Sequence, residues 1–378
     1  KEIEPIKEKF DSKEGTTIAP QLLEKMGELG FHGIGVPTEY GGLNCDMKTE
    51  LAYGEIASDS FAFSQAIGVH TGLGVYPILL YGTEAQKEKY LNDIVSAKIK
   101  CSYCLTEPGA GSDANSGKTR AELIDGGKSY KINGQKIWTS HAHHADWIFA
   151  LVRTSTEGKK QEGISFLLID MSTPGLEVKP IISIDGGHYL NEVYFTDVKV
   201  PVANRIGEEN LGWTYAKYLL GHERTGIAGV AKSKRKLEKL KEIAGLEQDS
   251  GEPLIDDPNF KSKVASVGIK LQALEVTNLR TLSAVSAGKS PGDASSILKI
   301  RGTELEQELN ELLMQSIGYY AHPYQPGRLF NQQSNTIPVG GDYSVGLMEE
   351  HLLRRAASIY GGSNEIQKNI IAKAIMGL

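Results

Sequence analysis

The chain has 378 residues, of which 40% are hydrophobic and 23% are charged, and its formal net charge is −6. These values are typical of an ordinary globular protein of two or three domains. The negative charge argues against nucleic acid as the main partner, because phosphate binding requires a basic surface. No apolar run approaches the roughly 18 residues that a membrane span requires, so no membrane association is expected.

The three cysteines, Cys45, Cys101 and Cys104, are odd in number, and two of them lie in one strand-like run. A disulfide framework is therefore not expected, and the reducing cytoplasm is the predicted location. A Cys-x-x-Cys spacing is also typical of metal or redox sites, but no second pair exists. We interpret Cys101 and Cys104 as small strand residues.

Residues 1–98 form a predicted N-terminal helical domain. Leucines 22, 23 and 29 and Met26 follow a helical spacing. Thr83 and Gln86 form a predicted capping box at the start of another helix. The apolar, glycine-dotted segment 61–81 is predicted to be a buried helix.

Residues 99–208 form a predicted central β-domain, resembling a small barrel. Asn133-Gly134 is a strong hairpin signal, because this dipeptide favours a two-residue turn. The strand-like runs are Ser102–Thr106, Thr119–Ile124, Tyr130–Trp138, Trp147–Arg153, Ile164–Ile169 and Glu192–Val200.

Residues 209–378 form a predicted C-terminal helical bundle, so the fold class is α+β with an α–β–α plan. The lysine-rich run Lys232–Lys241 is interpreted as a solvated helix face, with Leu237 and Leu240 pointing inward. The helical pattern covers residues 211–243, 257–287, 291–318 and 342–376.

Two segments of the β-domain carry the most informative motifs. Tyr103–Ser112 is a strand that ends in a hydroxyl, a carboxylate and a Pro-Gly-x-Gly loop, and Gly134–Ser140 is a strand that ends in an indole and two hydroxyls. Two such strand ends suit a planar polar heterocycle, which suggests a flavin. Gly109-x-Gly111-x-x-Ala114 formally fits a dinucleotide fingerprint, but no helix follows to hold a pyrophosphate, so a Rossmann site is rejected.

Glu223 interrupts an apolar stripe formed by Tyr215, Leu219, Ile227 and Val230 on one predicted helix. No lysine or arginine lies four residues away on either side. A buried carboxylate without a cation has a raised pKa, which suits a general base near neutral pH. A glutamate at the rim that hydrogen-bonds another helix is the alternative.

With these segments, the α–β–α plan and the C-terminal run Tyr360–Gln367, nearly the whole chain resembles the FAD-dependent acyl-CoA dehydrogenases. The resemblance places FAD beside the β-domain and Ser112, Arg224, Gly361 and Gly362 at the acyl-CoA substrate. The implied cofactor contacts are Tyr103, Leu105, Thr106, Gly111, Ser112, Trp138, Thr139, Ser140, Ser363 and Glu365.

The family reaction that the resemblance implies is α,β-desaturation, in which a carboxylate removes the α-proton while the β-hydrogen leaves as hydride to the flavin. Many members carry that base directly after the tyrosine of the C-terminal motif, where this chain has Gly361. A minority carry it on the first helix after the β-domain, and Glu223 matches that position. The Gly361 N–H would then bind the thioester carbonyl.

Two further departures from the family pattern affect the implied partners. The usual Arg-x-x-Phe-Gly run is missing, so the contacts to the FAD pyrophosphate and adenine are not assigned. The loop Pro323–Pro338 resembles a bacterial subgroup, some of whose members act on bulky or dicarboxylic thioesters, often as two-subunit assemblies. The resemblance implies an electron-transfer flavoprotein as acceptor and a homotetramer or homodimer, with a heteromer as the alternative.

Two other functions remain open at this stage. The chain is either a desaturase with Glu223 as base, or a non-catalytic or half-active FAD-binding subunit, or an acyl-CoA oxidase. His141, His143 and His144 are a conceivable metal site. We interpret them instead as a loop beside the flavin and assign no metal.

Overall fold

The computed structural model describes residues 15–46, 49, 66–287, 289, 294–325, 335, 337 and 339–378. The side chains of residues 15–19, 220–227 and 294 lie outside this description. The described part of the N-terminal region is helical. Its elements are α2 (Gly15–Glu28), the π-helix η4 (Gly68–Val75), α5 (Tyr76–Tyr81) and α6 (Glu84–Val95).

The helix start at Thr83 is confirmed. The Thr83 hydroxyl accepts a hydrogen bond from the Gln86 N–H, and the Gln86 side chain accepts one from the Thr83 N–H. Leu22, Leu23 and Met26 are buried as expected, whereas Leu29 lies beyond the end of α2 and is exposed. The predicted helix 61–81 is helical from residue 66 onward, and residues 61–65 lie outside the described residues.

The central region is one eight-stranded sheet, with the order β6-β7-β3-β2-β4-β5-β8 and β1 parallel to β4. The edge strands β6 and β8 do not pair with each other, so the sheet is open and the predicted barrel does not close. The strands are β1 (Cys101–Cys104), β2 (Arg120–Ile124), β3 (Ser129–Ser140), β4 (Trp147–Arg153), β5 (Ile164–Asp170), β6 (Leu176–Ile182), β7 (His188–Pro201) and β8 (Arg205–Ile206).

Strand β6 was not among the sequence-based predictions. It contains Pro180, which weakens a strand signal because proline cannot donate to the hydrogen-bond ladder. The structure resolves the conflict by placing β6 at the edge of the sheet.

The predicted hairpin turn at Asn133-Gly134 is wrong, because both residues lie inside the long strand β3. The register of β3 against β7 shifts between Ile132 and Gly134. A Cβ on Gly134 would lie 2.6 Å from the Cα of Thr119. The close approach of the backbone at Thr119 therefore explains this glycine. The turn between β2 and β3 instead uses Gly126 and Gly127, which both have positive φ angles.

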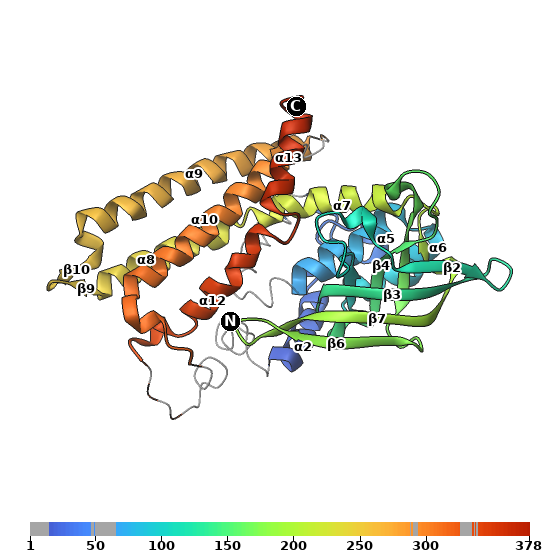
Figure 1. Cartoon of the computed structure of the whole chain (residues 1–378), viewed down its shortest axis with the longest axis horizontal. Helices are drawn as coiled ribbons and strands as arrows, with labels where there is room; N and C mark the ends of the chain where they lie inside the picture. The colour runs from blue at the N-terminus through green and yellow to red at the C-terminus, as the bar shows by residue number, and fades with distance from the viewer. Residues whose placement is uncertain are drawn as a thin grey trace.

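The C-terminal region is a helical bundle, as predicted, and Figure 1 shows it beside the sheet, with α7 lying next to the sheet region. A two-stranded ribbon, β9 (Gln248–Asp249) and β10 (Glu252–Pro253), joins two of its helices. The helices are α7 (Gly212–Ile227), α8 (Val230–Leu246), α9 (Pro258–Ser286), α10 (Ala294–Ile317), α12 (Leu347–Leu353) and α13 (Asn364–Ala374), with a 3₁₀ segment, η12 (Arg354–Ser358), after α12.

The single helix predicted over residues 211–243 is two helices, α7 and α8. Gly229 has a φ of 58°, in the left-handed region that ends an α-helix. A Cβ on Gly302 of α10 would lie 2.6 Å from the Ala228 carbonyl oxygen, so α10 packs closely against this junction. Val230 therefore begins a new helix and is not part of the apolar stripe around Glu223.

Of the four buried apolar clusters among the described residues, three hold these layers together. One contains Val75, Ile78 and Leu91 from the N-terminal helices together with Phe149 and Phe166 from the sheet. A second consists of other buried side chains of the sheet region, and a third lies among α8, α9 and α10. Among the described helices, none combines the length and apolar character that crossing a bilayer would require.

Candidate flavin and thioester site

The two informative strand ends of the β-domain lie side by side. The Ile137 N–H donates to the Thr106 carbonyl at 2.9 Å. The Ser102 hydroxyl donates to the Ser140 carbonyl at 2.6 Å. The segments 103–112 and 134–140 therefore form one continuous surface, which confirms the proximity that their sequences predicted.

A buried ion pair lies on the interior side of this surface and supports it. Lys136 Nζ lies 2.8 Å from the Glu107 carboxylate and 3.0 Å from the Leu105 carbonyl oxygen. The Glu107 carboxylate also accepts hydrogen bonds from the backbone N–H groups of Lys118 and Thr119. Burial alone would raise the pKa of Glu107, but Lys136 and the two N–H donors outweigh it and lower the pKa. The carboxylate is thus ionised and fixed under the loop.

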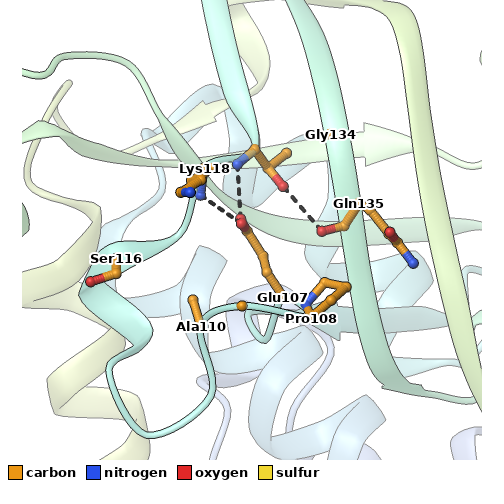
Figure 2. A pocket seen from close by; sticks show the side chains of 9 residues that line it. Glu107, Pro108, Ala110, Ser116, Lys118, Gly134 and Gln135 are labelled. Carbon is orange, nitrogen blue, oxygen red and sulfur yellow. Dashed lines mark hydrogen bonds between the residues drawn. The ribbon is translucent and has the colours of Figure 1, made fainter.

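The loop above this ion pair borders an open cleft (Figure 2). The cleft has a volume of ≈ 270 Å³, and Gly109 and Gly134 lie on its wall with Gln135. No described atom lies within 4 Å of the position that a Cβ would take on Gly109 or Gly111. The glycines of the Pro-Gly-x-Gly loop therefore leave room for a ligand to approach the backbone.

Trp138 presents an open indole at the end of β3. Its side chain is 54% exposed and its φ is 61°, at an irregularity in the pairing of β3 with β7. Such a bulge turns a side chain away from the ladder and re-aims it. Ser140 is half-buried nearby, whereas Thr139 is only 2% exposed and its enclosed hydroxyl has no hydrogen-bond partner among the described residues.

These groups fit a flavin. An aromatic face exposed on an ordered strand can stack against a flat heterocycle, and the adjacent loop offers hydroxyls and unobstructed backbone. Leu105 and Thr106 are half-buried, and Ser112 is exposed at the far end of the loop. The ring of Tyr103 is half-buried and its edge packs against Phe166, with the ring centroids 5.9 Å apart.

A second group of predicted site residues lies before α13. Gly361 and Gly362 have φ angles of 65° and 82°, and the Gln367 side chain lies 3.5 Å and 3.3 Å from their carbonyl oxygens. In a trans peptide the N–H points away from the carbonyl, so the N–H groups of Gly362 and Ser363 face away from Gln367. Neither N–H has a hydrogen-bond acceptor within the described part of the chain.

The residues that follow these glycines fix the start of α13. The Ser363 hydroxyl accepts a hydrogen bond from the Ile366 N–H and caps the helix. The Asn364 side chain accepts a hydrogen bond from the buried Lys299 at 2.8 Å. Glu365 is exposed in the first turn, where its own backbone N–H lowers the pKa of its carboxyl.

Glu223 and Arg224 lie on the last turns of α7. Their side chains are outside the described residues, so their direction stays a prediction. The helix itself contacts β5, α5, η4 and α10, and it thus connects the sheet region with the C-terminal helices. Leu219, one turn before Glu223, is buried against these elements.

The structure brings the three histidines of the 141–144 loop together, with one ring nitrogen of each within 4.8 Å of the others. The hydrogen bonds of Asn191 determine the protonation of His143. Because the Thr139 carbonyl only accepts, the Asn191 amide nitrogen must face it, at 3.1 Å. The same nitrogen lies 3.0 Å from His143 Nδ1, which therefore acts as an acceptor.

The proton of a neutral His143 ring accordingly sits on Nε2. Burial and the neighbouring histidines lower the pKa of His143 to about 3, so the ring is neutral near pH 7. A metal ligand requires an unprotonated nitrogen, and Nδ1 is already occupied by Asn191. These hydrogen bonds disfavour a three-histidine metal site.

Several supporting residues were not identified from the sequence. Lys136 donates to the Leu105 carbonyl, Gln367 donates to the carbonyls of Gly361 and Gly362, and Asn364 accepts from Lys299. Lys136 left one local signal, because it is a charged residue at an inward position of an otherwise alternating strand. The partners of Gln367 are close in sequence, but no periodic pattern shows that its side chain turns back to them, and the partner of Asn364 lies on a segment that is distant in sequence.

The comparison with known proteins covers nearly the whole chain. Residues 1–98, 102–198 and 210–376 match, in turn, the N-terminal, middle and C-terminal domain models of the acyl-CoA dehydrogenases. The acyl-CoA dehydrogenase FadE26 of Mycobacterium tuberculosis is 34% identical over 95% of this chain and 87% of its own length. An acyl-CoA dehydrogenase of Bacillus subtilis is 31% identical over 94% of this chain and 90% of its own length.

Solved structures agree with these matches. The ChsE4-ChsE5 complex of Mycobacterium tuberculosis contains a chain that is 32% identical, with a TM-score of 0.82 over 96% of this chain and 90% of that chain. The acyl-CoA dehydrogenase of Geobacillus kaustophilus is 26% identical, with a TM-score of 0.83 over 94% and 89%. The chain belongs to the acyl-CoA dehydrogenase family, whose members are FAD-binding oxidoreductases that act on CH–CH bonds.

Proposed function

We propose that this protein catalyses the FAD-dependent α,β-desaturation of an acyl-CoA thioester, with Glu223 as the base that removes the α-proton. The observation that carries this proposal is the segment Gly361–Gly362, which places a glycine where many relatives have a glutamate. A base is still required, and Glu223 on α7 is the carboxylate that matches the alternative position. It lies on α7 one helical turn after the buried Leu219.

The glycine segment has a separate role in this proposal. The sequence assigned the Gly361 N–H to this role, and the N–H of Gly362, which follows the anchored Gly361 carbonyl, is a second donor without an acceptor among the described residues. Such donors stabilise negative charge that develops on a thioester carbonyl oxygen, which makes the α-proton more acidic. FAD, when bound, accepts the hydrogen that leaves the β-carbon. We assign Tyr103–Ser112, Trp138–Ser140, Ser363 and Glu365 to the flavin, and Ser112 and Arg224 to the CoA portion.

We further propose a bulky acyl group as the substrate class. Gly361 removes a side chain from the reaction centre, and no described atom lies within 4 Å of a Cβ built on Gly68 or Gly72 of the π-helix η4. A steroid acyl-CoA dehydrogenase, Tcur3481-Tcur3483, is 27% identical with a TM-score of 0.82 over 99% of this chain and 91% of that chain. The loop Pro323–Pro338, most of which lies outside the described residues, suggested the same subgroup.

The acceptor in this proposal is an electron-transfer flavoprotein, and the assembly is a homotetramer, a homodimer or a heteromer. The ChsE4-ChsE5 complex is a two-component relative, which keeps the heteromer open. The competing functions are a half-active FAD-binding subunit and an acyl-CoA oxidase.

An anaerobic titration with a panel of acyl-CoA thioesters tests the proposal. Loss of the visible absorption of the oxidised flavin with one class of thioester supports the desaturase and identifies the acyl group. A yellow protein that no thioester bleaches contradicts it and favours the subunit function, and rapid oxygen consumption with the same thioester favours the oxidase.

A further inference from the structure

The end of β3 that carries Trp138 is irregular. From Lys136 to Thr139, β3 advances by three residues, whereas their partners on β7 are two residues apart. The extra residue on β3 makes a β-bulge, in which Trp138 adopts a φ of 61°. This left-handed conformation is costly for a residue with a side chain, so neighbouring groups must hold it in place.

Two buried side chains hold the backbone that follows Trp138. Asn191 of β7 donates from Nδ2 to the Thr139 carbonyl at 3.1 Å. Ser102 of β1 donates from Oγ to the Ser140 carbonyl at 2.6 Å. Two successive carbonyls are thus fixed by side chains from two different strands. We call Asn191 and Ser102 the two anchors.

The Asn191 amide is itself fixed by two histidines. Its Oδ1 lies 2.9 Å from His188 Nε2, and its Nδ2 lies 3.0 Å from His143 Nδ1. The two imidazole rings are stacked, with their centroids 4.0 Å apart. The oxygen and both N–H groups of the Asn191 amide therefore have partners, and the amide has one satisfied orientation.

Packing of the core does not explain the two anchors. A buried amide or hydroxyl contributes little net stability even when it is hydrogen-bonded, and Trp138, whose backbone the anchors support, is 54% exposed. The proposed function gives this indole a partner, because Trp138–Ser140 is assigned to the flavin. A group that binds a ligand has to be held to within about 0.5 Å of its productive position.

We infer that Asn191 and Ser102 are positioning residues that hold the Trp138–Ser140 segment against the flavin. Both act through the carbonyls of Thr139 and Ser140, and neither is assigned a chemical step. The inference rests on the flavin contacts of the proposed function. It predicts a change at the flavin itself, which a loss of stability alone would not produce.

The test uses the FAD-loaded protein and observes the flavin rather than turnover. The dissociation constant of FAD and the fluorescence emission of the bound flavin are measured for the wild type, Trp138→Leu, Asn191→Leu and Ser102→Ala. An indole that stacks on a flavin quenches its emission, so Trp138→Leu reports whether the indole lies there.

Asn133→Leu is the matched control. Asn133 lies on β3 at the other irregularity of its pairing with β7, between Ile132 and Gly134. Its side chain also bonds across to β7, because it donates to the Asp197 carboxylate and accepts from the Asp197 N–H. Asn133→Leu therefore disturbs the same pair of strands away from Trp138.

Asn191→Leu is expected to weaken FAD binding about tenfold, the effect of losing one buried hydrogen bond, and to raise the flavin emission. Ser102→Ala is expected to change both quantities in the same direction by a smaller factor. Trp138→Leu combined with Asn191→Leu is expected to show the emission of Trp138→Leu alone, because the anchor acts through the indole. Asn133→Leu is expected to match the wild type.

Wild-type flavin emission in both Asn191→Leu and Ser102→Ala would overturn the inference, whatever their affinity for FAD. An equal rise in Asn133→Leu would overturn it too, because any disturbance of β3 would then have the same effect. If Asn191→Leu does not fold, Ser102→Ala decides, since it removes a single hydroxyl. Wild-type emission in Trp138→Leu would instead contradict the flavin contacts of the proposed function, so the two failures are distinguishable.

Discussion

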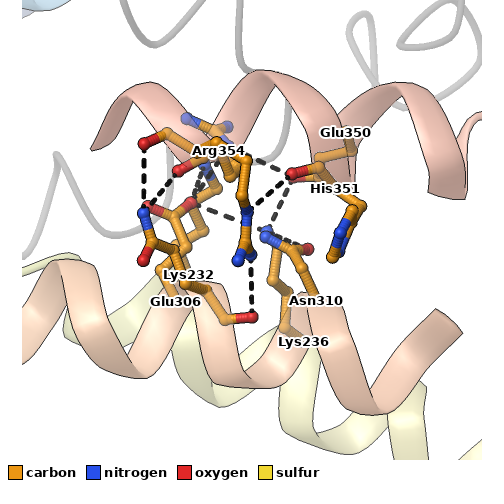
Figure 3. A network of polar contacts seen from close by, with 9 residues as sticks. Lys232, Lys236, Glu306, Asn310, Glu350, His351 and Arg354 are labelled. Atoms are coloured by element: carbon orange, nitrogen blue, oxygen red, sulfur yellow. Dashed lines mark hydrogen bonds and ion pairs between the residues drawn. The ribbon is translucent and has the colours of Figure 1, made fainter. Parts of the chain in front are cut away.

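Two regions of the molecule hold buried charge, and they balance it differently. Under the Pro-Gly-x-Gly loop, Glu107 and Lys136 form a balanced pair, and two backbone N–H groups complete the carboxylate. Where α8, α10 and the end of α12 meet (Figure 3), three cations (Lys232, Lys236 and Arg354) surround two carboxylates (Glu306 and Glu350), so this group has one cation more than it has carboxylates. The loss of a lysine is therefore expected to destabilise the balanced pair strongly and the group with the excess cation only slightly.

The largest effect is expected for Lys136→Met. This change leaves the Glu107 carboxylate buried without its cation, and removing one partner of a buried ion pair typically costs about 3–5 kcal/mol of unfolding free energy. Chemical denaturation measures the loss. Lys131→Met is the control on the same strand, because Lys131 is exposed, and its expected cost is below about 1 kcal/mol. Equal stabilities of the two variants would show that the pair does not support the loop.

The next largest effect is expected on acidification, because two buried histidines, His32 and His70, are uncharged in the folded protein. His32 and His70 are fully buried, and burial lowers their pKa values to about 4 and about 3. His70 Nδ1 accepts the Cys101 N–H, so protonation there would place two donors against each other. Because the folded pKa is below the unfolded one, stability is lost as pH falls below 6.5. At pH 5.5 the expected loss is about 1.4 kcal/mol per histidine.

Denaturation curves at pH 7.5 and pH 5.5 check this prediction. His70→Gln, which keeps a donor and an acceptor but does not titrate in this range, is expected to lose about 1.4 kcal/mol less stability on acidification than the wild type. An identical loss in both proteins would assign the acid sensitivity to other groups. The carboxylates Glu107, Glu306 and Glu350, with lowered pKa values, are expected to contribute only below pH 4.5.

The smallest effect is expected for Lys232→Met, the same substitution in the other region. Burial and the adjacent Arg354 lower the pKa of Lys232 to about 8, so its charge is costly in the fold. Its removal leaves two cations and two carboxylates, and the expected change in unfolding free energy is within about 1 kcal/mol. A loss as large as that of Lys136→Met would show that the excess cation is required.

Local signals in the sequence predicted much of the fold, and long-range packing accounts for the rest. Most strands of the sheet, the cap at Thr83 and the absence of an α-helix directly after Gly111 follow from neighbouring residues. Asn133-Gly134 misled the prediction because its glycine serves a close approach to Thr119, which is distant in sequence. The solvated face predicted for Lys232–Lys241 is wrong at Lys232 and Lys236, because their carboxylate partners lie on α10 and α12.

The candidate site shows the same division. The two strand ends were placed together by their motifs, and their hydrogen bonds confirm it. Leu237 and Leu240 point inward as the helical spacing predicted. The predicted stripe around Glu223 ends before Val230, because Gly229 breaks the helix. The ion pairs of Lys232 and Lys236 join helices that are distant in sequence, so only the structure reveals them.

The central claim is that Glu223, and not a residue of the Tyr360–Gly362 segment, is the base. The most direct measurement compares Glu223→Gln with the wild type in the anaerobic titration, with FAD content and thioester affinity measured on the same samples. The account predicts bound FAD, retained thioester binding and a rate of flavin bleaching at least about 10²-fold lower, the minimum contribution of a general base. Bleaching at the wild-type rate would contradict the account and assign the base elsewhere.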